Sequence, residues 1–164
     1  MATKSQIDCL RLAPRAKVAA VLLNERFPDV EFTSGLRDVP AQARVMAVNQ
    51  IRQPKWIGQT YIQGKELQKD IENNILYLET LPQMQEFILT WLQRQTPEFL
   101  AGFTRHLGGY AFDIQPLVDN TGIITAQGFK VVEFIKSNIR PEKFLQSEGG
   151  LPVWHLQFTP TEEV

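Results

Sequence analysis

The stretch Thr104-Arg105-His106-Leu107-Gly108-Gly109-Tyr110-Ala111-Phe112-Asp113-Ile114 organises the sequence, and the rest of the chain is interpreted outward from it. The glycine pair indicates a turn, and the apolar alternation after it predicts a strand with Asp113 facing away from the core. Ala111 shares that face and leaves space beside the carboxylate. His106 before the turn and Asp113 in the strand can therefore converge on one point, as two ligands of a metal ion must.

Helical and strand patterns account for most of the remaining chain. Helices are predicted at about residues 14–26, 41–50, 65–77, 83–95 and 126–138. Strands are predicted at 30–34, 143–146 and 151–159, with Ser147-Glu148-Gly149-Gly150 as a hairpin turn between the last two. Residues 51–64 are predicted as an ordered loop, and residues 97–100 as a short turn. The fold class predicted from this order is α+β, with helices packed on a small, mostly antiparallel sheet.

Three of these helices show an apolar face, and the one at 126–138 carries Phe129, Val132, Phe134 and Ile135. In the helix at 14–26 the face combines the alanines with Val18, Val21 and Leu22. In the helix at 83–95 an apolar stripe follows the helical period, which favours core packing over a binding surface. That stripe consists of Met84, Ile88, Trp91 and Leu92.

Composition bounds the class of protein. A chain of 164 residues fits one domain with a substantial core, and a formal net charge of -1 gives no reason to expect nucleic acid as a partner. The single cysteine, Cys9, excludes an internal disulfide and a multi-cysteine metal site. No apolar run approaches the roughly 20 residues of a membrane span, and the N-terminal residues do not resemble a signal peptide. Synthesis in the cytoplasm is therefore expected.

The second of the two histidines, His155, lies in the last predicted strand. Trp154, Leu156 and Phe158 form the apolar face of that strand, so His155 faces the other way. Two imidazoles and one carboxylate make a three-ligand zinc set with a fourth position open for water, whose pKa zinc lowers to about 7. The alternative interpretation is two unrelated histidines that make ordinary hydrogen bonds.

Three short motifs resemble those of a known enzyme family. The run His106-x-x-Gly109-x-Ala111-x-Asp113 is similar to the first signature of the zinc D-Ala-D-Ala carboxypeptidases and dipeptidases, which include L-alanyl-D-glutamate endopeptidases of phage endolysins. Trp154-His155 resembles the second signature, and Ser34-Gly35-Leu36-Arg37 a third. Thr104 stands where the family usually has serine, and Leu36 where it has an aromatic residue. The motifs follow in the family's order over residues 30–159.

The resemblance implies a specific site. His106, Asp113 and His155 would bind Zn²⁺, and Gln42 falls where the family often carries a glutamine. Arg37 would hold a substrate carboxylate or polarise the scissile carbonyl, which suits its permanent charge and forked donors. The implied chemistry is metal-assisted hydrolysis of an amide bond in the peptide stem of peptidoglycan.

One departure concerns the general base. The family has a carboxylate three residues before the second histidine, and Pro152 occupies that position here. Glu148 is the predicted base, provided that Gly149-Gly150 lets the chain fold back toward the metal. The other candidates are Asp38, Asp119, or a site that binds without cleaving.

The predicted function is that of an endolysin-like zinc peptidase acting on the cell wall. Residues 51–100 are predicted as a helical insertion into a single domain spanning 1–164, and would wall the substrate cleft or form a partner surface. A protein without a signal peptide would reach the wall after release, or by delivery with a phage or injection particle. The alternatives are a non-catalytic cell-wall-binding or structural module with the same fold, or a D,D-dipeptidase or carboxypeptidase acting on soluble substrates.

Overall fold

The computed structural model describes residues 4–160, which form two compact units. The first unit contains the described residues up to Leu36, then Gly108–Ser147, then the described residues from Pro152 onward. The second contains Arg37–Leu107 and Glu148–Leu151, so the predicted insertion at 51–100 lies wholly inside it. The expectation of a single domain stays a prediction.

The first unit is built on an antiparallel sheet with strand order β1-β2-β4-β3, which confirms the α+β class. Its strands are β1 (Phe32–Ser34), β2 (Ala111–Ile114), β3 (Lys143–Glu148) and β4 (Leu151–Gln157), the tip of the β3–β4 hairpin belonging to the second unit. Its helices are α1 (Lys4–Cys9), α2 (Pro14–Arg26), α8 (Ala126–Phe134) and the π-helical turn η4 (Ile135–Ile139). The predicted hairpin is confirmed, with Gly149 and Gly150 both at positive φ in its two-residue turn.

Helix α2 packs through small residues. Ala16, Ala19, Ala20 and Leu23 are buried in the core of the first unit, at the i, i+3, i+4, i+7 spacing of one helical face. Val18 and Leu22 from the predicted apolar face are instead 60% and 44% exposed. The face with Ala16, Ala19 and Ala20 packs on the core because its small side chains let the helix approach its neighbours closely. Val18 lies on a different face of the helix.

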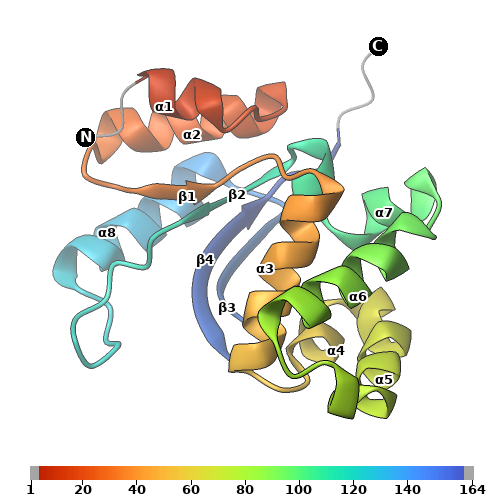
Figure 1. The fold of residues 1–164 in the computed structure, drawn as a ribbon. Helices are drawn as coiled ribbons and strands as arrows, with labels where there is room; N and C mark the ends of the chain where they lie inside the picture. The colour runs from red at the N-terminus through yellow and green to blue at the C-terminus, as the bar shows by residue number, and fades with distance from the viewer. Residues whose placement is uncertain (1–3, 161–164) are drawn as a thin grey trace. The chain divides into compact units, whose positions relative to one another are not determined.

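The second unit is helical. Its elements are α3 (Val39–Arg52), α4 (Trp56–Thr60), η1 (Ile62–Gly64), α5 (Lys65–Asn73), η2 (Ile75–Tyr77), α6 (Leu81–Gln93), α7 (Pro97–Phe103) and most of η3 (Arg105–Gly108). Helices α3 and α6 lie side by side (Figure 1). The predicted stripe of α6 is core, since Met84, Ile88 and Leu92 are buried and Trp91 packs on Phe99 and Phe103.

Two segments predicted as irregular are helical. Residues 51–64 hold α4 and η1, because Trp56 and Ile57 bury themselves in the core and offset the low helix propensity of Gly58. Residues 97–100 open α7, whose start is fixed by the Thr96 hydroxyl accepting from the Phe99 amide at 3.2 Å. Tertiary burial and a cap therefore outweigh the turn signals of glycine and proline.

No helix of the described chain combines the length and the apolar character required to cross a bilayer.

Candidate metal centre

The pairing of β2 with β4 brings two of the predicted ligands together. Asp113 lies directly opposite His155, flanked by the pairs Phe112–Leu156 and Ile114–Trp154. Those flanking side chains belong to the core of the first unit. Because side chains alternate between the faces of a sheet, Asp113 and His155 share the opposite face.

The two side chains are joined directly. The Nδ1 atom of His155 and the Oδ1 atom of Asp113 share a hydrogen bond of 2.8 Å. His155 is 5% exposed and Asp113 is 6% exposed, so each of these buried polar groups has the other as a hydrogen-bond partner. Ala111 is fully buried on the same strand face as Asp113, as predicted, and its methyl group occupies little of that space.

His106 lies before the glycine turn, as predicted, and comes from a 3-10 helix. It lies in η3 and is 3% exposed. Its amide donates to the Thr104 hydroxyl over 3.4 Å, and its carbonyl accepts from the Arg37 amide over 3.1 Å. Gly109 follows at φ +74°, where a Cβ atom would lie 3.0 Å from the Arg11 carbonyl oxygen. The turn therefore requires glycine at this position.

His106, Asp113 and His155 form a group that could hold a metal ion. Each offers one ligand atom, the three atoms all lie within 4.8 Å of one another, and all three residues are buried. Two imidazole nitrogens and one carboxylate oxygen are a donor set that zinc accepts, with one coordination position left over. Both histidines of the chain belong to this group, and the choice between a metal site and ordinary hydrogen bonds stays a prediction.

Arg37 is held at the start of α3 by a side-chain network. Its Nη1 atom donates to the Oε1 atom of Gln42 over 3.3 Å, and the Nε2 atom of Gln42 donates to the hydroxyl of Tyr61 over 2.9 Å. Gln42 is fully buried and Arg37 is half-buried. The main chain of Arg37 also contacts His106, so the structure brings these two predicted site residues together.

Two of the alternative bases have structural roles. Asp38 caps α3, its Oδ1 atom accepting from the Ala41 amide over 2.8 Å. Asp119 is exposed and accepts from the amide and hydroxyl of Thr121 and from the amide of Ile123. These bonds, that of the Thr121 hydroxyl first, hold the pKa of Asp119 below its ordinary value of 3.8. A lowered pKa makes a carboxylate a weaker base.

The hairpin determines what Pro152 and Glu148 can reach. Strand β4 is extended from Leu151 to Gln157, so a side chain at position 152 points to the face opposite His155. Leu151 itself lies about 13 Å along the strand from His155, at roughly 3.3 Å per residue. Glu148 precedes the turn, and its carbonyl oxygen accepts from the Trp56 indole over 2.9 Å. The assignment of Glu148 as the base stays a prediction.

Tyr61 is a member of this network, whereas the sequence placed it only among the residues expected to wall the cleft or form a partner surface. Its ring stacks on Phe103, with centroids 4.4 Å apart and planes 16° apart, and meets Trp56 edge-on at 5.5 Å. The only signal in the sequence is an aromatic residue between two glycines, Gly58 and Gly64, in a segment rich in polar residues. Such a signal does not identify the partner of a hydroxyl group.

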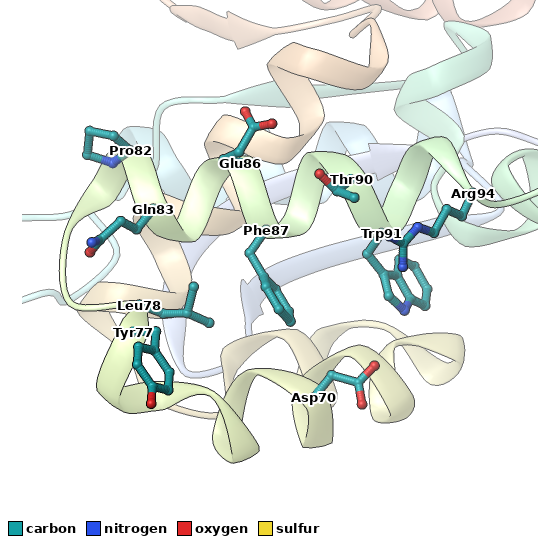
Figure 2. Close-up of a pocket in the computed structure, with 10 residues that line it drawn as sticks. All are labelled: Asp70, Tyr77, Leu78, Pro82, Gln83, Glu86, Phe87, Thr90, Trp91 and Arg94. Atoms are coloured by element: carbon teal, nitrogen blue, oxygen red, sulfur yellow. The ribbon is translucent and has the colours of Figure 1, made fainter.

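A groove of about 640 Å³ lies on the second unit, apart from this network. Figure 2 shows Phe87 and Trp91 pointing from α6 toward the helix that carries Asp70. Arg94 lies beside Trp91. The groove is thus lined by the flank of α6 that carries Phe87 and Trp91, next to the buried Met84, Ile88 and Leu92.

No family model, curated protein or solved structure matches this chain. The family resemblance therefore depends on the three motifs alone and stays a prediction. The geometry of the candidate centre is independent of it.

Proposed function

We propose that this chain is a zinc-dependent peptidase that hydrolyses an amide bond in the stem peptide of peptidoglycan. The observation that carries the proposal is the buried group of His106, Asp113 and His155, whose ligand atoms lie within 4.8 Å of one another. A bound zinc ion would supply Lewis acidity and a water of lowered pKa. The resemblance of the motifs to zinc peptidases supplies the substrate class.

The residues of the chain supply position and charge. The β2–β4 pairing fixes Asp113 and His155 on adjacent strands, so the chain spends little conformational entropy in arranging these two ligands. All three ligand residues are buried. Arg37 carries a permanent charge and a forked donor set, which would orient a substrate carboxylate or stabilise charge on the scissile carbonyl.

A second function is favoured by the geometry of β4. The face opposite His155 holds position 152, and proline occupies it, so this strand offers no carboxylate for proton transfer at the position the resemblance implies. A metal-holding module that binds cell wall without cleaving it would account for this. Such a module would keep the donor group and dispense with the base.

The deciding experiment uses zinc-loaded protein and purified cell walls between pH 6 and 9. A peptidase releases new amino and carboxyl termini, and chelation stops the release until zinc is restored. Soluble stem peptides run in parallel would reveal a carboxypeptidase or dipeptidase acting on small substrates. Zinc-dependent co-sedimentation with cell walls and no new termini at any pH would establish the binding module and refute the peptidase.

A further inference from the structure

A hydrogen-bonded chain of three side chains lies within the second unit. The hydroxyl of Tyr61 accepts from Gln42 over 2.9 Å, and Gln42 accepts from the guanidinium of Arg37 over 3.3 Å. We propose that Tyr61 is a positioning residue for Arg37 and acts through the amide of Gln42. The inference rests on the proposed function only in giving Arg37 a substrate to contact.

The orientation of the Gln42 amide follows from its neighbours. A guanidinium carries donors and no acceptor, so only the amide oxygen of Gln42 can face Arg37. The amide nitrogen must then face Tyr61, whose hydroxyl oxygen accepts the bond. Reversing the amide would set two donors against each other at the Arg37 side. Arg37 thus sets the orientation of the amide, and the Tyr61 hydroxyl accepts from the amide nitrogen that this orientation presents, which holds the amide in place.

Burial makes the hydrogen bond between the Gln42 amide and the Tyr61 hydroxyl important to the network. Gln42 is fully buried, so water does not replace a lost partner of its amide. The main chain of Arg37 is fixed as well, because its amide donates to the His106 carbonyl over 3.1 Å. The main chain of Arg37 is bonded to that of His106, and its guanidinium is bonded to the buried amide of Gln42. Both ends of the Arg37 side chain are therefore restrained.

Tyr61 has a rigid aromatic support. Its ring stacks on Phe103, which lies three positions before His106, and packs edge-on against Trp56. The Trp56 indole is in turn fixed by its bond to the Glu148 carbonyl. Tyr61 and Trp56 lie in the predicted insertion at 51–100, and with Phe103 just beyond it they fix the hydroxyl to which the network is anchored. This assigns the insertion a part in the site, and not only a core of its own.

The first test removes the hydroxyl and keeps the ring. Tyr61→Phe is expected to lower kcat/KM about tenfold, since small misplacements of a positioning group are costly to catalysis. Zinc affinity should stay at the wild-type value, while the urea midpoint should fall modestly, because the buried amide nitrogen of Gln42 loses its acceptor. Tyr77→Phe is the matched control, because Tyr77 belongs to the same unit and is 75% exposed. Equal activity of Tyr61→Phe and wild type would refute the proposal.

The second test separates positioning from a general structural role. Arg37→Lys keeps the positive charge but removes the guanidinium whose N–H group donates to Gln42. If Tyr61 acts through Arg37, adding Tyr61→Phe to Arg37→Lys should reduce kcat/KM less than twofold further. A full tenfold loss in both backgrounds would mean that Tyr61 acts elsewhere, and would refute the proposal.

A third readout does not need activity. The ¹⁵N spectrum of the Arg37 guanidinium reports rotation about its Cζ–Nε bond, which the bond to Gln42 slows. Tyr61→Phe should speed this rotation, and Tyr77→Phe should leave it unchanged. If wild-type protein cleaves no cell-wall substrate, the proposed function fails, yet this spectrum still decides the relation between Tyr61 and Arg37. Identical spectra for wild type and Tyr61→Phe would overturn it.

Discussion

Asp113 and His155 lie directly opposite each other on β2 and β4, and 2.8 Å separates the Oδ1 atom of one from the Nδ1 atom of the other. Backbone pairing, not side-chain flexibility, therefore brings these two groups together. The flanking pairs of the same ladder are core residues, so the position of the two polar groups is as well determined as that of the core. A change of either side chain should affect metal binding before it affects the fold.

The first prediction concerns metal affinity. Asp113→Ala removes one of three donors and should weaken zinc binding by on the order of 100-fold or more, since even outer partners of ligands cost 10–100-fold. Competition with a chromophoric chelator measures the affinity. Asp119→Asn is the matched carboxylate control, because Asp119 lies in an exposed turn and belongs to no ligand group. Unchanged affinity in Asp113→Ala would remove this residue from the centre.

The second prediction concerns the general base. If Glu148 transfers the proton, Glu148→Gln should lower kcat at least about 100-fold, the usual contribution of general-base catalysis, with zinc affinity unchanged. The main-chain bond from Trp56 to the Glu148 carbonyl does not involve the side chain, so the hairpin should persist. Steady-state rates on cell walls decide the matter. Activity within twofold of wild type would exclude Glu148 and leave the base to another group.

The third prediction separates a cap from a base at Asp38. Its Oδ1 atom accepts from the Ala41 amide at the start of α3, so Asp38→Ala should destabilise the protein by about 1 kcal/mol. Asp38→Ser keeps a capping oxygen and should retain both stability and activity. Urea denaturation and rate measurements on the same two variants provide the check. A large loss of rate in a stable Asp38→Ser protein would instead indicate a chemical role.

The fourth prediction concerns the hairpin tip. A Cβ atom at Gly149 would lie 2.4 Å from the Trp56 ring, and the φ of Gly149 is +53°. Gly149→Ala should therefore cost about 2–4 kcal/mol, combining left-handed strain and a clash. Gly122 has φ +84° with nothing within 4 Å, so Gly122→Ala should cost only the strain, about 1–2 kcal/mol. Denaturant midpoints compare the two, and equal costs would contradict the packing of the tip on Trp56.

The fifth prediction concerns pH. Hydrogen bonds from Thr121 first, then from the Ile123 amide, hold the pKa of Asp119 below 3.8. A lowered folded-state pKa stabilises the turn fully above pH 3.8, and this stabilisation is lost as the pH falls through the lower folded value. The amide signals of Thr121 and Ile123 should therefore shift together below pH 3.8. Asp119→Asn should abolish that titration, and an unchanged titration would assign it to another group.

Local periodicity was enough to predict most of the regular elements. The alternation around Trp154 and Leu156 correctly predicted which face of β4 is core, and the stripe of α6 was correctly predicted as buried. The apolar face of α2 was predicted correctly for its alanines, which are buried, and wrongly for Val18 and Leu22, which are exposed. Hydrophobicity alone carries no information about how close two backbones can approach.

The candidate centre was predictable because its chemistry requires rare residues. A chain with two histidines has few ways to make such a group, and both join it with Asp113. The network beside it was not predictable in the same way. Tyr61 meets Gln42 across 19 positions through a buried amide, and no local pattern encodes that pairing. The helical character of residues 56–60 was also hidden, since it depends on the burial of Trp56 and Ile57 in a distant core.

The bond between the Trp56 indole and the Glu148 carbonyl joins residues 92 positions apart within the second unit. A nascent chain released as far as Leu107 holds every helix of that unit, but still lacks the four residues that end at Leu151. Those residues follow 44 positions later (151 − 107), which is roughly 2–9 s of synthesis at about 5–20 residues per second. Until then the Trp56 indole lacks this acceptor, so the second unit cannot be complete before Leu151 has been synthesised.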